Sequence, residues 1–205
     1  MGVLSRFISY AFHPLFMPLY TMVLCLELDP YLSVFLPYKA KITLYGILII
    51  NTIVIPLGTL IYLKRKGLIP SYELKQRKNR TLPYAMTFLY YLLTYMVLRK
   101  TGLPDTVFQL LLIGVFGTFL VLVVNHFWKI SAHAIGIGGL VGAMCGLAIA
   151  HQYVNPILLF AVWLIAGLVG TARLYLQAHK PAQVYVGFLA SFFFAFAAVG
   201  YGWYV

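Results

Sequence analysis

Residues 106–127 read "TVFQLLLIGVFGTFLVLVVNHF", an apolar run that contains no Asp, Glu, Lys or Arg. A helix needs roughly 17 to 25 apolar residues to cross about 30 Å of hydrocarbon, and this run has that length. It therefore predicts a transmembrane helix.

Comparable runs lie on both sides of it, which predicts an all-α, polytopic transmembrane helical bundle of about six to seven spans in one domain, residues 1–205. The composition agrees, since 62% of the residues are hydrophobic and 9% are charged, against about a quarter charged in soluble domains. The first run lacks a small-residue cleavage pattern, so we expect a retained span, kinked at Pro14 and Pro18. The seven runs are 7–27, 42–63, 82–98, 106–127, 134–150, 156–172 and 183–204.

The positive charges are distributed unevenly between the two sides of such a bundle. The formal net charge is +11, and if the helices cross in series, most of the 15 Lys and Arg residues fall on one side, together with His133 and His179. The positive-inside rule would make this side cytoplasmic, but a phosphate ligand also requires clustered cations, and both explanations remain open. The cations are scattered over connections without a nucleic-acid-binding module, so we expect no nucleic acid partner. The richer side holds Arg6, Lys64, Arg65, Lys66, Lys75, Arg77, Lys78, Arg80, Lys129, Arg173 and Lys180.

Two polar segments on this side are candidates for anion binding. In "ELKQRKNRTLP", residues 73–83, Arg77 and Arg80 would share a helical face, whereas each cation taken alone is better explained by a solvated, positive-inside loop. In "NHFWKISAHAIGIGG", residues 125–139, a helix that begins near His133 would point free N–H groups toward the junction, where an anion could bind. The alternative is that Ser131 only caps this helix and His133 lies at the membrane interface.

A third candidate, "ARLYLQAHKPAQ" at residues 172–183, carries Arg173 and His179, which are six residues apart. One continuous helix would point them to different faces, so a turn is expected between them if both serve one site. Pro181 suits a first helical turn, on which Gln183 could contact the His179 ring and make it a plausible nucleophile toward phosphorus. Arg173 and Lys180 could instead extend to the membrane interface from the helix ends.

Small residues recur every four positions in the run 134–150. Such a ridge lets transmembrane helices approach closely, so we expect this helix at the centre of the bundle or at a homodimer contact. His126 and His133 could share a helical face, but no carboxylate or thiol completes a ligand set, so no metal is expected. The ridge consists of Ala134, Gly138, Gly142, Gly146 and Ala150.

Together the three polar segments resemble the three signatures of the phosphatidic acid phosphatase type 2 superfamily, over about residues 60–205, with 1–63 as leading helices. The third signature, Ser-Arg, five residues, His, three residues, Asp, corresponds to the segment that begins at Ala172. The second, Pro-Ser-Gly-His, corresponds to Ile130 through His133. The first, Lys, six residues, Arg-Pro, is barely matched, because Thr81 and Leu82 separate Arg80 from Pro83.

The resemblance implies a metal-independent lipid phosphatase without a cofactor, acting on a lipid phosphate in the bilayer, in the inner membrane of a bacterium. His179 would attack phosphorus to form a phosphohistidine, and His133 would protonate the leaving group. Gln183 replaces the Asp that would orient and charge-stabilise His179, which also allows a relative that only binds or transports lipid phosphates. The implied phosphate-binding residues are Arg173, Ser131, Ala132, Arg77, Arg80, Lys75 and Lys129.

Overall fold

The computed structural model describes residues 2–72, 74, 76–152 and 155–202, and in this part of the chain every regular element is a helix. Six helical stretches are long and apolar enough to cross a membrane, so the chain is an integral membrane protein with a polytopic helical bundle, as its sequence predicts. These stretches are Tyr38–Arg65, Arg77–Leu98, Asp105–Phe127 (α7), Ala132–Ala150 (α8), Pro156–Tyr175 (α9) and Pro181–Gly200 (α10). The first contains α4 (Tyr38–Leu48), a π-helical segment η1 (Ile49–Val54) and α5 (Ile55–Arg65), and the second a 3₁₀ turn η2 (Arg77–Arg80) and α6 (Thr81–Leu98).

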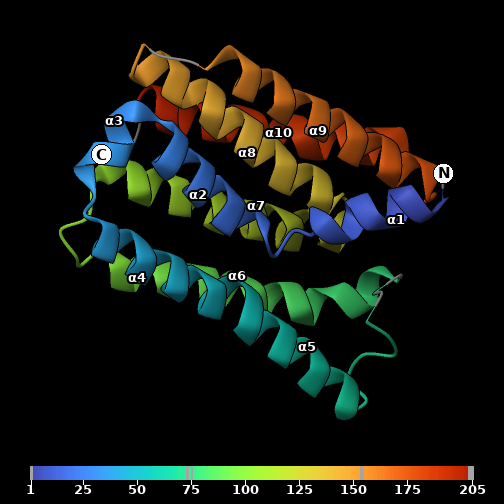
Figure 1. Cartoon of the computed structure of the whole chain (residues 1–205). Coiled ribbons are helices and arrows are strands. Elements are labelled where there is room, and N and C mark those ends of the chain that lie inside the picture. The colour runs from blue at the N-terminus through green and yellow to red at the C-terminus, as the bar shows by residue number, and fades with distance from the viewer. Residues whose placement is uncertain (1, 73, 75, 153–154, 203–205) are drawn as a thin grey trace.

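The first apolar run differs from the single kinked helix expected over 7–27. It forms two helices, α1 (Gly2–Ala11) and α2 (Met17–Leu28), which follow each other along the bundle in Figure 1. Proline disfavours the helical conformation of the residue before it, and α1 ends at Ala11, so that His13, directly before Pro14, lies outside the helix. A turn follows, in which the Phe16 N–H donates to the His13 carbonyl at 2.9 Å. The expected kink in one helix is therefore a turn between two helices.

Successive spans alternate in direction, as a serial crossing requires. The ends of α5, α7 and α9 and the starts of α6, α8 and α10 lie at one end of the bundle, which we refer to as the cation-rich end (Figure 1). Short links hold it together: the Ser131 N–H donates to the Gln183 carbonyl at 3.2 Å, and the Arg77 guanidinium donates to the Phe127 carbonyl. The three polar connections of the sequence thus meet at one place.

The helix α8 is the most deeply buried of the six spans and packs along α10. Its small-residue ridge makes this contact: a Cβ atom added at Gly138 or Gly142 would collide with the Phe188 or Phe192 carbonyl of α10. Of the two uses expected for the ridge, the structure shows close packing at the centre of the bundle. Because His133 lies at the start of α8 and Gln183 at the start of α10, this packing sets their relative position.

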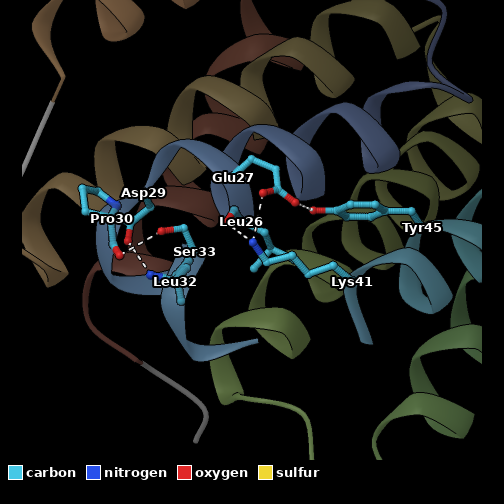
Figure 2. A network of polar contacts seen from close by, with 8 residues as sticks. All are labelled: Leu26, Glu27, Asp29, Pro30, Leu32, Ser33, Lys41 and Tyr45. Atoms are coloured by element: carbon cyan, nitrogen blue, oxygen red, sulfur yellow. Dashed lines mark hydrogen bonds and ion pairs between the residues drawn. The ribbon is translucent and has the colours of Figure 1, made fainter. Parts of the chain in front are cut away.

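The opposite end of the bundle carries a network of acidic residues, shown in Figure 2. The buried Lys41 ammonium donates to Glu27 at 2.9 Å, and the Tyr45 hydroxyl donates to the other Glu27 oxygen at 2.7 Å. Asp29 caps the short helix α3 (Pro30–Phe35) by accepting from the Leu32 N–H at 2.9 Å. This network joins α2, α3 and α4, and it keeps carboxylates away from the cation-rich end.

Candidate functional site

A cavity of about 220 Å³ opens among the helices at the cation-rich end. Its polar wall gathers basic side chains from four separate parts of the chain, and its remaining walls are mostly apolar and extend between α2, α5, α6, α7 and α8. The polar wall is formed by His13, Arg80, His133, Arg173 and His179. A polar mouth above an apolar interior matches an amphiphilic ligand with an anionic head group.

His179 lies in the five-residue connection between α9 and α10, and the residue is buried, at 8% exposure. The helix α9 ends at Tyr175 and α10 begins at Pro181, so the turn expected between Arg173 and His179 is confirmed. Both side chains line the cavity. The turn therefore brings together two residues that one helix would have separated.

Gln183 holds the His179 ring from behind the cavity. Its Oε1 atom lies 3.2 Å from Nδ1 of His179 and accepts the Lys180 backbone N–H at 3.0 Å. The backbone donor identifies this atom as the amide oxygen, because the amide nitrogen cannot accept a hydrogen bond. Nδ1 must then carry the proton, and the lone pair of Nε2 is left free as a nucleophile.

The surroundings of His179 keep its ring neutral. Burial, and after it the charges of Arg173, Arg80 and Lys129, lower its pKa to about 4, although the hydrogen bond to Gln183 acts in the opposite direction. The same crowding of cations, after burial, lowers the pKa of Lys129. A group of cations this close together is stabilised when an anion binds among them.

The two arginines of the polar wall keep donor capacity for such an anion. Arg173 donates from Nη1 to the Ser9 hydroxyl at 3.1 Å, but its Nε is buried and has no hydrogen-bond partner among the described residues. Arg80 is buried and donates from Nε to the Leu74 carbonyl at 2.6 Å. Of the four acidic residues, Glu27, Asp29 and Asp105 lie at the opposite end, and Glu73 falls outside the described residues. An unpaired buried guanidinium N–H is a donor that a phosphoryl oxygen can satisfy.

His133 lies in the first turn of α8, and its Nε2 lies 3.0 Å from the Ser9 carbonyl. A carbonyl only accepts, so Nε2 carries a proton and Nδ1 is the atom that can exchange one. Ser131, two residues earlier, caps α8 by accepting the Ala134 N–H at 3.3 Å. Its hydroxyl serves the helix end, which leaves Ala132 and His133 as the residues of this segment that line the cavity.

The other expected phosphate-binding residues occupy different positions. Arg77 is exposed and donates to the Phe127 carbonyl, so it ties η2 to the end of α7 and does not line the cavity. Lys129 acts on His179 through its charge, without lining the cavity. Lys75 lies outside the described residues. Among the described cations of residues 73–83, Arg80 therefore lines the cavity and Arg77 does not.

The sequence interpretation missed the contribution of the first helices. Ser9 contacts both Arg173 and His133, and the ring of His13 lies 5.5 Å from that of His133, centroid to centroid. No motif in the sequence assigns His13 to the site. The signal that could have revealed it is the pair His13–Pro14, because a histidine directly before a helix-breaking proline is displaced from the helix.

The apolar part of the cavity ends at Tyr91. Its ring packs against Gly114, where an added Cβ would lie 3.3 Å from the ring, and its hydroxyl donates to the Thr52 carbonyl at 3.4 Å. Pro56 has no N–H for that carbonyl, so Tyr91 supplies a donor where the helix lacks one. A smaller second cavity is also lined by Pro18, Tyr91, Leu110 and Gly114. Tyr91 therefore lies in the wall that the two cavities share.

Within the described residues, no three His, Cys, Asp or Glu side chains come together as a metal site. Comparisons with protein-family models, with curated proteins and with solved structures give no match. The function must therefore be argued from the chemistry of the site. That chemistry consists of a neutral histidine with a free Nε2, a second histidine with a free Nδ1, and two guanidinium groups above an apolar cavity.

Proposed function

We propose that the protein is a membrane-embedded lipid phosphatase that hydrolyses a phosphomonoester or diphosphate of a lipid through a phosphohistidine intermediate. The observation that carries the proposal is the convergence of Arg80, Arg173, His133 and His179 on one cavity, together with the Nδ1 hydrogen bond that frees Nε2 of His179. The resemblance to the phosphatidic acid phosphatase type 2 superfamily points to the same chemistry. It also supports placing the protein in the inner membrane of a bacterium.

In the first step, Nε2 of His179 attacks phosphorus, an N–P bond forms, and the P–O bond to the lipid breaks. The bare Nδ1 of His133 takes the acidic proton of the bound phosphate monoanion and gives it to the departing lipid oxygen. In the second step, Nδ1 of the neutral His133 takes a proton from water, which attacks the phosphohistidine and releases phosphate and free His179. Through both steps Nε2 of His133 keeps its own proton and donates a hydrogen bond to the Ser9 carbonyl.

The guanidinium groups stabilise the charge that develops on the phosphoryl oxygens. Preorganised donors in a water-poor site are usually the largest single contribution to catalysis of this kind. The Nε atom of Arg173 is buried without a partner among the described residues, and Arg80 is held by the Leu74 carbonyl. The lipid tail would lie along the apolar walls toward Tyr91.

A second function, binding or transport of lipid phosphates without hydrolysis, is favoured by one observation. Gln183 orients His179 but carries no charge, so it cannot neutralise the imidazolium that forms when His179 is phosphorylated. In serine proteases, replacement of the orienting Asp by Asn costs roughly 10⁴ in kcat. A site of this kind could bind the substrate and react slowly or not at all.

Release of inorganic phosphate from phosphatidic acid by the purified protein tests the proposal, with His179→Ala as the matched control. We expect phosphate release by the parent protein, and mass spectrometry of the quenched reaction should find one phosphoryl group on the peptide that contains His179. Binding of the lipid without release above the His179→Ala level would reject the phosphatase and support the binding protein.

A further inference from the structure

The turn between α1 and α2 fixes the proton position on the His13 ring. Pro14 has no N–H, and the next free backbone donor, the Leu15 N–H, donates to Nδ1 of His13 at 3.3 Å. Nδ1 is therefore an acceptor, and the neutral ring carries its proton on Nε2. No described residue accepts a hydrogen bond from this Nε2–H.

His13 and His133 present opposite ring atoms to the same cavity. Their centroids lie 5.5 Å apart with the rings at 80°, and both rings line the cavity. The Nε2–H of His133 is used by the Ser9 carbonyl, which leaves a bare Nδ1, whereas His13 retains a free Nε2–H. The pair therefore offers one acceptor and one donor beside Arg173.

We propose that His13 is a substrate-binding residue whose Nε2–H donates a hydrogen bond to a phosphoryl oxygen, an inference that rests on the proposed lipid-phosphate site. Two guanidinium groups neutralise the charge of the phosphate, and His13 adds a neutral donor from the turn between α1 and α2. The Leu15 N–H keeps Nδ1 unprotonated, so His13 acts as a hydrogen-bond donor and not as an acid. The first two helices then form part of the phosphate site and do not merely precede it.

Two substitutions separate the hydrogen bond from the fold of the turn. In His13→Asn, the side-chain oxygen can accept the Leu15 N–H as an Asx turn does, but no donor reaches the position of Nε2. In His13→Gln, the longer amide places an N–H near that position. Both are made in the His179→Ala background, so that binding is measured without turnover.

The measurement is calorimetric binding of dodecyl phosphate in maltoside micelles, with inorganic phosphate in parallel to separate the contribution of the tail. We expect His13→Asn to weaken dodecyl phosphate binding by about 10- to 100-fold, the usual effect of losing a hydrogen bond to a charged group, and His13→Gln to retain most of it. Unchanged binding in His13→Asn, or equal losses in both variants, would overturn the assignment of His13. Absence of binding by the His179→Ala parent would instead reject the proposed function.

Discussion

Oε1 of Gln183 lies 3.2 Å from Nδ1 of His179, and the same oxygen accepts the Lys180 N–H at 3.0 Å. Two donors thus meet at one amide oxygen, which fixes the orientation of the amide and the tautomer of the imidazole. The contact orients the nucleophile as a carboxylate would. It differs from a carboxylate only in charge, and this difference can be tested directly.

Gln183→Glu should raise the turnover of a lipid phosphate by about 10-fold or more, because a carboxylate of the same length stabilises the imidazolium by charge as well as by orientation. Steady-state phosphate release measures the effect. Gln183→Leu is the control that provides neither orientation nor charge, and its turnover should be lower than that of the parent protein. A folded Gln183→Glu protein with an unchanged or lower rate would count against His179 as the nucleophile.

The His179 ring should remain neutral well below the pH at which histidines ordinarily titrate. Burial and neighbouring cations lower its pKa to about 4 in the folded protein, against about 6.5 in an unfolded chain. Between these values the unfolded chain binds more protons, so this group makes the folded state less stable as the pH falls through that window. Ring chemical shifts of ¹³C-labelled histidine, assigned with His179→Ala, should show the low midpoint, and a midpoint near 6.5 would contradict it.

Tyr91→Ala should lengthen the lipid tail that the cavity accepts, because it removes a large ring from the wall that the two cavities share. The ratio of kcat/KM for long-chain over short-chain lipid phosphates should rise. Tyr91→Phe keeps the ring while losing the hydrogen bond to Thr52, and it should keep the parent preference. An unchanged ratio in a folded Tyr91→Ala protein would show that the tail does not extend toward Tyr91.

Gly142→Val should destabilise the bundle, because its Cβ would collide with the Phe192 carbonyl on α10. Overpacking costs about 1–3 kcal/mol, and more where backbone must move. A lower Tm in detergent should accompany a loss of activity, since α8 and α10 position His133 and Gln183. Gly58→Val, at a lipid-facing position with open space around it, is the matched control and should change Tm little.

The spans could be predicted because membrane helices are constrained by length and polarity alone. The runs 106–127 and 156–172 correspond to α7 and α9 within a few residues. The two helices within the run 7–27 could not be predicted in the same way. The sequence stays apolar through the turn at Pro14, and hydropathy carries no information on backbone direction. Only local chemistry, a residue before proline and a side chain that accepts a backbone N–H, decides the break.

The site was predictable where its contacts are local in sequence. Four residues separate His179 from Gln183, so their contact follows from helical spacing. Arg77 does not reach the cavity because its guanidinium donates to the Phe127 carbonyl at the end of α7. The choice between Arg77 and Arg80 therefore depends on where α7 ends, which the spacing of the two arginines does not show. The part played by Ser9 and His13 depends on contacts more than 100 residues apart in sequence, which no spacing rule reveals.

The opposed placement of the two chain ends gives an experimental handle on membrane topology. The helix α1 starts at the cation-rich end, whereas α10 finishes at the far end, beside the acidic network (Figure 1). Reporter enzymes fused to the two termini should therefore be active in opposite compartments. Whichever compartment activates the amino-terminal fusion is the one from which the phosphate site is reached, so one pair of fusions decides from which side the head group enters.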